Sequence, residues 1–218
     1  MVRVKICGLT NLDDARMAWR AGADLLGFIF VPASPRCISP AQASAIINAL
    51  REEGCQALCV GVFADAPASE VEKIAEQCRL DLVQLHGAEP PAYARGLHCP
   101  VVRAHRVRGA VPWEELLAYD AWAYLLDSYH PQQAGGTGQH WAWDEMDLSA
   151  VPPVRLIVAG GLTPDTVAEA VRRLHPWGVD VSSGVESRPG QKDPDRVRDF
   201  ILRAKAVRMG GQDAEIEH

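Results

Sequence analysis

Long hydrophobic runs and clusters of basic charge are both missing from this sequence. No apolar run approaches the roughly eighteen residues of a membrane-spanning helix, so we expect no membrane partner. The formal net charge is −6 and no lysine or arginine cluster stands out, so nucleic acid is not an expected partner. The chain enters strand-like sequence directly, without the charged, apolar and small-residue segments of a secretion signal. We therefore expect a cytoplasmic location.

Metal-binding spacings are also absent. The six cysteines show no C-x-x-C spacing, and the seven histidines form neither H-x-H nor H-E-x-x-H. We therefore predict no metal site, and we expect reduced thiols that are mostly buried as small hydrophobic side chains. A cysteine in this chain receives a chemical role only where its position supports one.

What the sequence does contain is a regular alternation of strand-like and helix-like segments. Its 218 residues, 48% of them hydrophobic, suit one domain with a sizeable core. Short apolar runs recur at intervals of roughly 20–35 residues, as repeated βα units require. The eight runs are Val2–Cys7, Leu25–Phe30, Ala57–Phe63, Leu82–Leu85, Val101–His105, Ala123–Asp127, Leu156–Ala159 and Val179–Ser182.

The segments between these runs carry helix signals. Asn11 can cap a helix that extends to Arg20, and Ser39 precedes a proline at the first position of the next helix. Further helices are expected over 68–77, 164–174 and 194–207, with weaker candidates near 91–95 and 112–118.

Nearly continuous hydrophobic strands predict a parallel sheet that helices cover on both faces. Eight such units favour the α/β class, as a single (β/α)8 TIM barrel with a parallel eight-stranded core, over an open doubly wound sheet. We predict that the barrel domain spans residues 1–207. The remaining residues, 208–218, are polar and glycine-containing, and we expect a disordered tail there.

Two potential proton-transfer groups stand at the ends of expected strands. Cys7 closes the first strand and Asp127 closes the sixth, and each is followed by a turn-prone segment. In a parallel barrel the carboxyl ends of the strands gather on one face, where active sites are built. A thiol and a carboxyl group on that face suggest acid–base catalysis.

Phosphate binding is the second function that the sequence indicates. Gly160 and Gly161 follow the seventh strand, and Ser183 and Gly184 follow the eighth. The loops after these two strands often form the phosphate site of this fold, because glycines let backbone N–H groups approach the oxygens. The alternative is that these glycines only make tight turns.

An ordered set of motifs extends over residues 2 to about 205. It comprises Lys5-Ile6-Cys7-Gly8-Leu9-Thr10, Gly27-Phe28-Ile29-Phe30, Ser34-Pro35-Arg36, Gly61-Val62-Phe63, Val83-Gln84-Leu85-His86-Gly87, Leu125-Leu126-Asp127, Gly135-Gly136-Thr137-Gly138, Ala159-Gly160-Gly161-Leu162 and Val179-Asp180-Val181-Ser182-Ser183-Gly184-Val185-Glu186. With these motifs in this order, the chain resembles the phosphoribosylanthranilate isomerase family, whose members are (β/α)8-barrel enzymes of tryptophan biosynthesis.

The resemblance implies a cofactor-free Amadori rearrangement of N-(5-phosphoribosyl)anthranilate, a small-molecule substrate, to a 1-deoxyribulose 5-phosphate derivative. An acid protonates the furanose oxygen, the ring opens to an iminium, and a base removes a proton from the second sugar carbon. The enolamine then tautomerises to the ketone. Carried over by motif position, Cys7 is the general base and Asp127 is the general acid.

Each group needs a tuned pKa. Lys5 shares a strand face with Cys7, so its cation would favour the thiolate that a base requires. Asp127 must hold its proton near neutral pH, and Asp180 on the eighth strand is a candidate neighbour that would raise its pKa. Lys5 and Asp180 are also candidate substrate-binding residues. The alternatives are a barrel-rim cation that pairs with an acid for Lys5, and a carboxylate that caps a helix or anchors a loop for Asp180.

Other candidate substrate contacts lie in the loops. Arg36 can bind the anthranilate carboxylate in a bidentate manner, and the alternative is an arginine exposed to solvent. His86 can border the aromatic ring, and the alternative is a histidine at the barrel rim whose hydrogen bonds are made within the protein. Gly135–Gly138 resembles a loop that closes over substrate.

Two other classes of function compete with this interpretation. The related aminoaldose isomerase of histidine biosynthesis, or a bifunctional version of it, uses two aspartates, whereas the first strand here ends in Cys7. A catalytically silent phospho-ligand-binding barrel would not require both Cys7 and Asp127. The sequence leaves open whether the protein is a monomer or a homodimer.

Overall fold

Eight parallel strands close into a barrel in the computed structural model of this chain, which describes residues 1–107, 110–127 and 151–207. The order of strands around the barrel follows their order in the chain, and β1 closes the ring against β8. The strands are β1 (Arg3–Ile6), β2 (Leu25–Ile29), β3 (Leu58–Phe63), β4 (Leu82–Leu85), β5 (Val101–Arg106), β6 (Ala123–Asp127), β7 (Leu156–Ala159) and β8 (Gly178–Val181). The predicted parallel eight-stranded barrel is confirmed.

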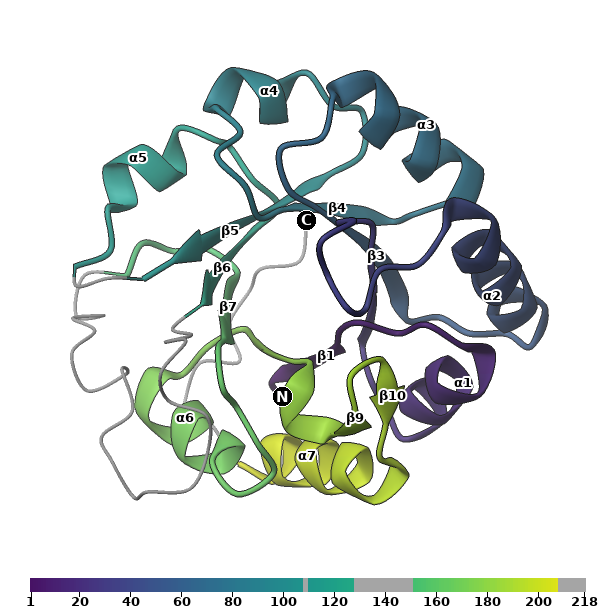
Figure 1. Ribbon diagram of the computed structural model, residues 1–218. Helices are drawn as coiled ribbons and strands as arrows, with labels where there is room; N and C mark the ends of the chain where they lie inside the picture. The colour runs from purple at the N-terminus through teal and green to yellow at the C-terminus, as the bar shows by residue number, and fades with distance from the viewer. Residues whose placement is uncertain (108–109, 128–150, 208–218) are drawn as a thin grey trace.

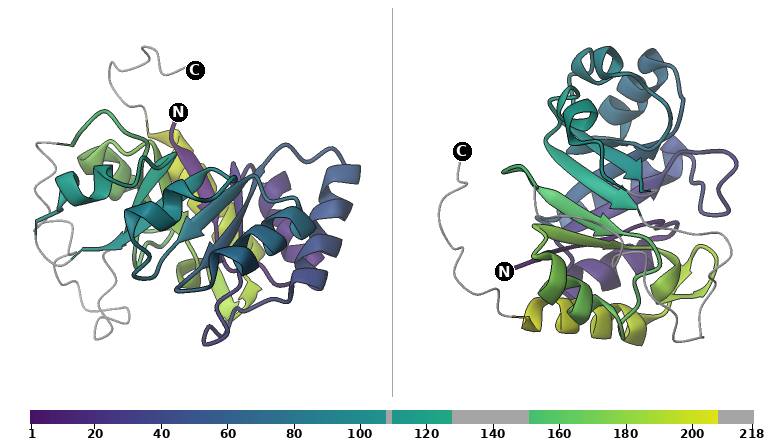
Figure 2. Two further views of the ribbon diagram at one scale, coloured as in Figure 1. Left: turned by 90° about the horizontal axis from the view of Figure 1, so that it is seen from above. Right: turned by 90° about the vertical axis from the view of Figure 1, so that its left-hand side faces the viewer.

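Helices surround the barrel, as the view along its axis and the side views show (Figures 1 and 2). They are α1 (Leu12–Arg20), α2 (Pro40–Glu52), α3 (Ala68–Cys78), α4 (Pro91–Arg95), α5 (Trp113–Leu117), α6 (Val167–Leu174) and α7 (Pro194–Ala206). The Asn11 side chain accepts a hydrogen bond from the Asp14 amide at the start of α1. Ser39 and Gln42 form a reciprocal capping box at the start of α2, so both predicted helix starts are confirmed.

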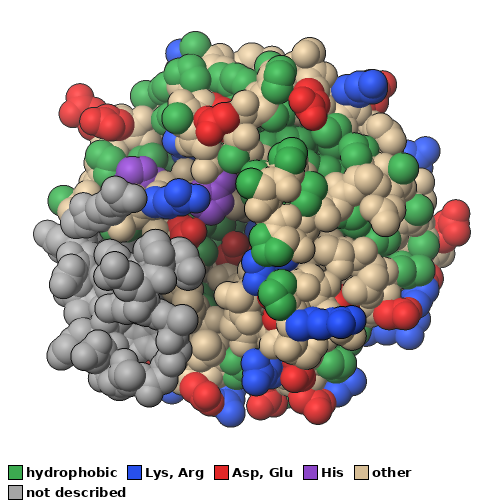
Figure 3. All heavy atoms as spheres, viewed as in Figure 1, with side chains coloured by type: hydrophobic (Ala, Val, Ile, Leu, Met, Phe, Trp, Pro, Cys, Tyr) green, Lys and Arg blue, Asp and Glu red, His purple; other side chains and the backbone are tan. Residues whose placement is uncertain are grey.

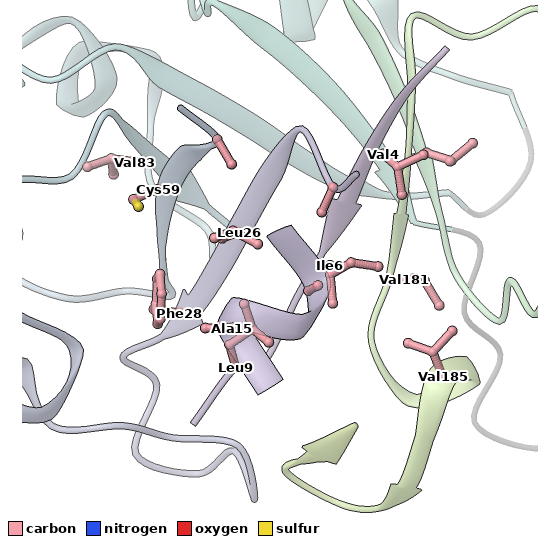
Figure 4. Close-up of a cluster of buried hydrophobic side chains, with 14 of the residues drawn as sticks. Val4, Ile6, Leu9, Ala15, Leu26, Phe28, Cys59, Val83, Val181 and Val185 are labelled. Carbon is pink, nitrogen blue, oxygen red and sulfur yellow. The ribbon is translucent and has the colours of Figure 1, made fainter. Parts of the chain in front are cut away.

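The alternation of side chains along each strand separates two hydrophobic layers. Val4 and Ile6 of β1 face outward and pack with the helices, where Figure 4 shows Ile6 between Leu26 and Val181. A smaller cluster of inward-facing residues fills the barrel. Its members are Leu25, Val60, Leu82, Val102, Ala104, Ala123, Leu125, Ile157 and Ala159. Lys5 lies between the two outward residues of β1, so the same period-two pattern directs its side chain to the barrel interior.

One helix begins later than its sequence pattern predicted. The pattern placed the start at Pro164, whereas α6 begins at Val167. Thr163 and Thr166 bond to each other, with the Thr163 amide donating to Thr166 Oγ1 at 3.0 Å. This local turn competes with the first helical turn, which is the usual behaviour of threonine side chains at helix starts.

A short hairpin after β8 was not predicted. The chain makes a 3-10 turn, η2 (Ser183–Val185), and then pairs β9 (Glu186–Arg188) with β10 (Gln191–Lys192) in an antiparallel ribbon. Figure 1 places this ribbon between α1 and α7, and the Lys192 amide of β10 donates a hydrogen bond to Asp14 of α1. Gly190 has a φ of +80° at its turn, a conformation that favours glycine.

Two predictions lie outside the described residues, namely the closing loop at Gly135–Gly138 and the tail at 208–218. Within the three described ranges, no helix is long and apolar enough to cross a membrane.

Candidate active site

The carboxyl end of β1 presents Cys7 directly after the strand. Its thiol is buried, and Lys5 lies two residues earlier with only 1% of its side chain exposed. Both groups approach Gly27 on the neighbouring strand β2. A Cβ added at Gly27 would lie 2.8 Å from Cys7 Sγ and 3.1 Å from Lys5 Nζ. The missing side chain at Gly27 therefore makes the space in which the thiol and the ammonium group meet.

Asp180 completes this buried group from β8, which pairs with β1 in register at Lys5. Lys5 Nζ lies 3.1 Å from Asp180 Oδ1. Burial by itself lowers the pKa of Lys5, but the Asp180 carboxylate and the Cys7 thiol outweigh burial and hold that pKa above its ordinary value. Lys5 is therefore a fixed cation at neutral pH. Asp180, which we expected beside Asp127, forms its ion pair with Lys5.

The balance at Cys7 differs from the sequence-based expectation. Burial raises the pKa of the Cys7 thiol and Asp180 raises it further, while Lys5 and Lys192 lower it without cancelling the rise. Desolvation therefore wins over the nearby cations, and without substrate the protonated thiol is the favoured form. The cation beside Cys7 is present as predicted, but it does not by itself produce a thiolate.

Asp127 ends β6 and faces a histidine. His86, directly after β4, places its Nε2 3.4 Å from Asp127 Oδ2. That ring nitrogen is buried and has no hydrogen-bond partner among the described residues. The loop that carries His86 is fixed by the buried Glu89, whose Oε2 accepts hydrogen bonds from the Gly87 amide and from Arg103. The ring is thus held against the carboxylate from an anchored loop.

The loops after β7 and β8 meet as the phosphate prediction requires. Gly160 and Gly161 have positive φ values of 96° and 66°, so the chain turns sharply there. A Cβ added at Gly184 would overlap the Leu162 carbonyl oxygen, so the two loops touch through their backbones. Gly184 lies in η2 and not in a tight turn of its own. This contact brings the four predicted phosphate residues to the same end of the barrel.

A serine that the sequence did not single out lies in the same place. Ser182 Oγ is buried and has no hydrogen-bond partner among the described residues. It would lie 3.0 Å from a Cβ added at Gly8, the residue after Cys7. The prediction named Ser183 instead, because the consecutive serines differ only in the direction of their side chains, which the sequence does not give.

Arg36 is held by a carboxylate of the protein. Its Nε and Nη2 donate to Glu186 Oε1 and Oε2 at 2.8 and 2.6 Å. Glu186 Oε1 also accepts a hydrogen bond from Lys192 Nζ at 2.9 Å. Glu186 and Lys192 belong to the unpredicted hairpin. The Pro189-Gly190 pair between two short polar segments was the sequence signal that would have located it.

Ionisable side chains of both signs therefore gather at one end of the barrel. Figure 3, viewed as in Figure 1, shows acidic, basic and histidine side chains together near the middle of this face. Within the described ranges, no group of three or more histidine, cysteine or acidic side chains is arranged to hold a metal ion. The arrangement supplies a thiol, a carboxyl group, fixed cations and backbone amides, which together suit proton transfer on an anionic substrate.

Comparison with known proteins gives the same picture over nearly the whole chain. The family model described as N-(5'-phosphoribosyl)anthranilate (PRA) isomerase matches residues 4–203. The chain belongs to this isomerase family. An N-(5'-phosphoribosyl)anthranilate isomerase of Citrifermentans bemidjiense is 49% identical over 209 residues, which are 96% of this chain and 100% of the relative.

Solved structures of the family agree with the fold. One is a crystal structure of mutually generated monomers of the dimeric phosphoribosylanthranilate isomerase from Thermotoga maritima. It superposes with a TM-score of 0.79 at 37% identity, and the match covers 95% of this chain and 100% of that one. A second isomerase, in complex with reduced 1-(o-carboxyphenylamino)-1-deoxyribulose 5-phosphate, has a TM-score of 0.78 at 35% identity with the same coverage.

Proposed function

We propose that this chain converts N-(5'-phosphoribosyl)anthranilate to 1-(o-carboxyphenylamino)-1-deoxyribulose 5-phosphate by an Amadori rearrangement, as a step of tryptophan biosynthesis. One observation carries this proposal beyond family membership. The Cys7 thiol adjoins a buried Lys5–Asp180 ion pair, at the barrel end where Asp127 also closes its strand. A buried ion pair is costly unless its partners are well satisfied, so its position beside a thiol favours a chemical role.

In the proposed mechanism Asp127 donates a proton to the furanose ring oxygen. The C1–O bond breaks, and the nitrogen lone pair forms an iminium at the first sugar carbon. Cys7 first loses its thiol proton to solvent. The resulting thiolate takes the proton from the second sugar carbon, and the electron pair of that C–H bond forms the enolamine. Tautomerisation of the enolamine gives the ketone.

The raised pKa of Cys7 fits this order of events. A protonated, buried thiol is unreactive towards other electrophiles before substrate binds. The iminium that follows ring opening is a new positive charge close to the second carbon, and a cation in a desolvated site stabilises the thiolate. Lys5 adds to this stabilisation, since its charge and its hydrogen bond already lower the pKa of Cys7.

Substrate recognition is assigned to the surrounding groups. The backbone amides at Gly160–Gly161 and Ser183–Gly184 bind the phosphate. Arg36 binds the anthranilate carboxylate, and His86 orients Asp127. We further propose that the reaction needs no metal or cofactor, and that the protein acts in the cytoplasm as a monomer or homodimer.

The test is the loss of substrate fluorescence when the purified protein is mixed with freshly generated N-(5'-phosphoribosyl)anthranilate. Cys7→Ala and Asp127→Asn should each lower turnover by about 10²–10⁴-fold, the usual contribution of general acid–base catalysis. Cys37→Ala is the matched control, because Cys37 is an exposed free cysteine. Near-normal turnover in either site variant would remove that residue from its role. A folded protein that binds the phosphorylated product without converting the substrate would instead be a silent binding barrel.

A further inference from the structure

Three charged side chains, two of them buried and one half-buried, form a cluster beside Cys7 that the proton-transfer chemistry does not use. They are Arg36, from the loop after β2, and Glu186 and Lys192, from the two strands of the hairpin. The Lys192 side chain is fully buried and that of Glu186 is 4% exposed. Burying the charges of Glu186 and Lys192 is costly, so an arrangement of this kind calls for a reason beyond stability.

The cluster lies against the catalytic strand. A Cβ added at Gly8 would lie 2.7 Å from Arg36 Cδ, so the arginine side chain crosses the backbone directly after Cys7. Gly8 also has a φ of +75°. Lys192 is near enough to Cys7 to lower the pKa of its thiol. The guanidinium is therefore placed at the edge of the proposed active site.

Glu186 fixes the orientation of the Arg36 guanidinium but also weakens its attraction for an anion. The bidentate contact sets the plane of the guanidinium, yet a carboxylate beside Arg36 cancels its positive charge. An Arg36–Glu186 pair alone would repel a substrate carboxylate nearly as much as it attracted one. Lys192 resolves this conflict, because its ammonium donates to the same Glu186 carboxylate at 2.9 Å and leaves the three groups with one net positive charge.

We propose that Lys192 is a positioning residue for substrate selection, which neutralises Glu186 so that the oriented Arg36 attracts an aryl carboxylate. This inference rests on the proposed function, in which Arg36 binds the anthranilate carboxylate. Glu186 orients the guanidinium, and Lys192 keeps it electropositive.

The contacts around the cluster agree with these charge states. Burial raises the pKa of Glu186, but the hydrogen bonds from Arg36 and Lys192 outweigh burial and keep that pKa below its ordinary value. Burial lowers the pKa of Lys192, and the Glu186 carboxylate opposes this shift without cancelling it. The ammonium form is favoured by two oxygen acceptors of Nζ, Glu186 Oε1 and the Ser182 carbonyl at 3.1 Å. Two further charges face the backbone of the cluster, since Asp14 accepts from the Lys192 amide and Arg196 donates to the Glu186 carbonyl. The charges of Asp14 and Arg196 are opposite, so together they leave the net charge of the cluster unchanged.

The experiment compares two ligands by calorimetry. One is reduced 1-(o-carboxyphenylamino)-1-deoxyribulose 5-phosphate, and the other is its analogue without the ring carboxyl group. The ratio of their dissociation constants isolates carboxylate recognition from phosphate binding. We expect the unmodified protein to prefer the carboxylated ligand by about tenfold or more, as for a hydrogen bond between charged groups.

Lys192→Gln keeps a donor for Glu186 and removes the charge, and it should lower this preference to about threefold or less. Adding Glu186→Gln to Lys192→Gln restores the net positive charge, so the double variant should regain most of the preference. Lys205→Gln is the control. Its Nζ bonds Gly22 O and lies 2.8 Å from Asp24 Oδ2, and this substitution should leave the preference unchanged.

A purely structural role for Lys192 predicts a different pattern, in which the double variant prefers the carboxylated ligand no more than the single variant does. That pattern, or an unchanged preference in Lys192→Gln, would overturn the inference. If Lys192→Gln does not fold, the double variant decides, because it contains neither buried charge. The proposed function can fail separately, since an absence of turnover in the unmodified protein leaves the comparison of ligands intact. Equal binding of both ligands by the unmodified protein would overturn the carboxylate site and this inference together.

Discussion

Gly27 offers a sharp test of the geometry around Cys7. A Cβ at this position would lie 2.8 Å from Cys7 Sγ, 3.0 Å from Cys7 Cα and 3.1 Å from Lys5 Nζ. Carbon atoms pack at about 3.5–4.0 Å, so Gly27→Ala forces shifts of several tenths of an ångström or more. The Cys7 contact includes a backbone atom, and rotation of the thiol alone does not relieve it.

Two effects on stability oppose each other in Gly27→Ala. Alanine restricts the unfolded chain and stabilises the fold by about 0.4–1 kcal/mol. Overpacking of a buried site costs about 1–3 kcal/mol, so a net loss of up to about 2.5 kcal/mol is expected. Catalysis should suffer more, because a displacement near 1 Å at a reacting group costs about 10²-fold.

The assay is turnover of N-(5'-phosphoribosyl)anthranilate, with urea unfolding in parallel. Gly96→Ala is the control, because Gly96 has an ordinary helical φ of −82° and its added Cβ would lie no closer than 3.4 Å to other atoms. Turnover of Gly27→Ala within about twofold of the unmodified protein would refute the argument that this glycine makes room for the proton-transfer group.

Two further predictions concern the phosphate loops and the thiol. Gly184→Ala places a methyl group on the Leu162 carbonyl and should separate the two loops. KM should therefore rise by at least about tenfold, with a smaller change in kcat. An unchanged KM would count against the phosphate assignment. Burial raises the pKa of the Cys7 thiol, so in the protein without substrate the ultraviolet absorbance of its thiolate, taken as the difference from Cys7→Ala, should still increase at a pH where an ordinary thiol is already ionised; a thiolate signal that is complete at neutral pH would contradict this. Asp180 is one cause of that rise, and Asp180→Asn should move the same thiol titration to lower pH, unlike Asp165→Asn at an exposed site.

The sequence by itself determined the architecture, because that information is local and repeated. Apolar runs on both faces of each strand require a covered parallel sheet, and eight such units are enough to close a barrel. The ends of these runs then placed Cys7 and Asp127 at the same end of the barrel, since parallel strands finish on one face. The caps at Asn11 and Ser39 were also readable, because each depends on residues only three positions apart.

The partners of the ionisable groups followed only from the tertiary structure. Lys5 and Asp180 are 175 residues apart in the chain, and Arg36 and Glu186 are 150 apart. No local pattern encodes such pairs, because they depend on the register of β1 against β8 and on the path of the hairpin. The direction of the Cys7 pKa shift is of the same kind, since the sequence shows the nearby cation but not the depth of burial. The sequence shows which residues carry charge. The closure of the barrel determines which of these charges come into contact.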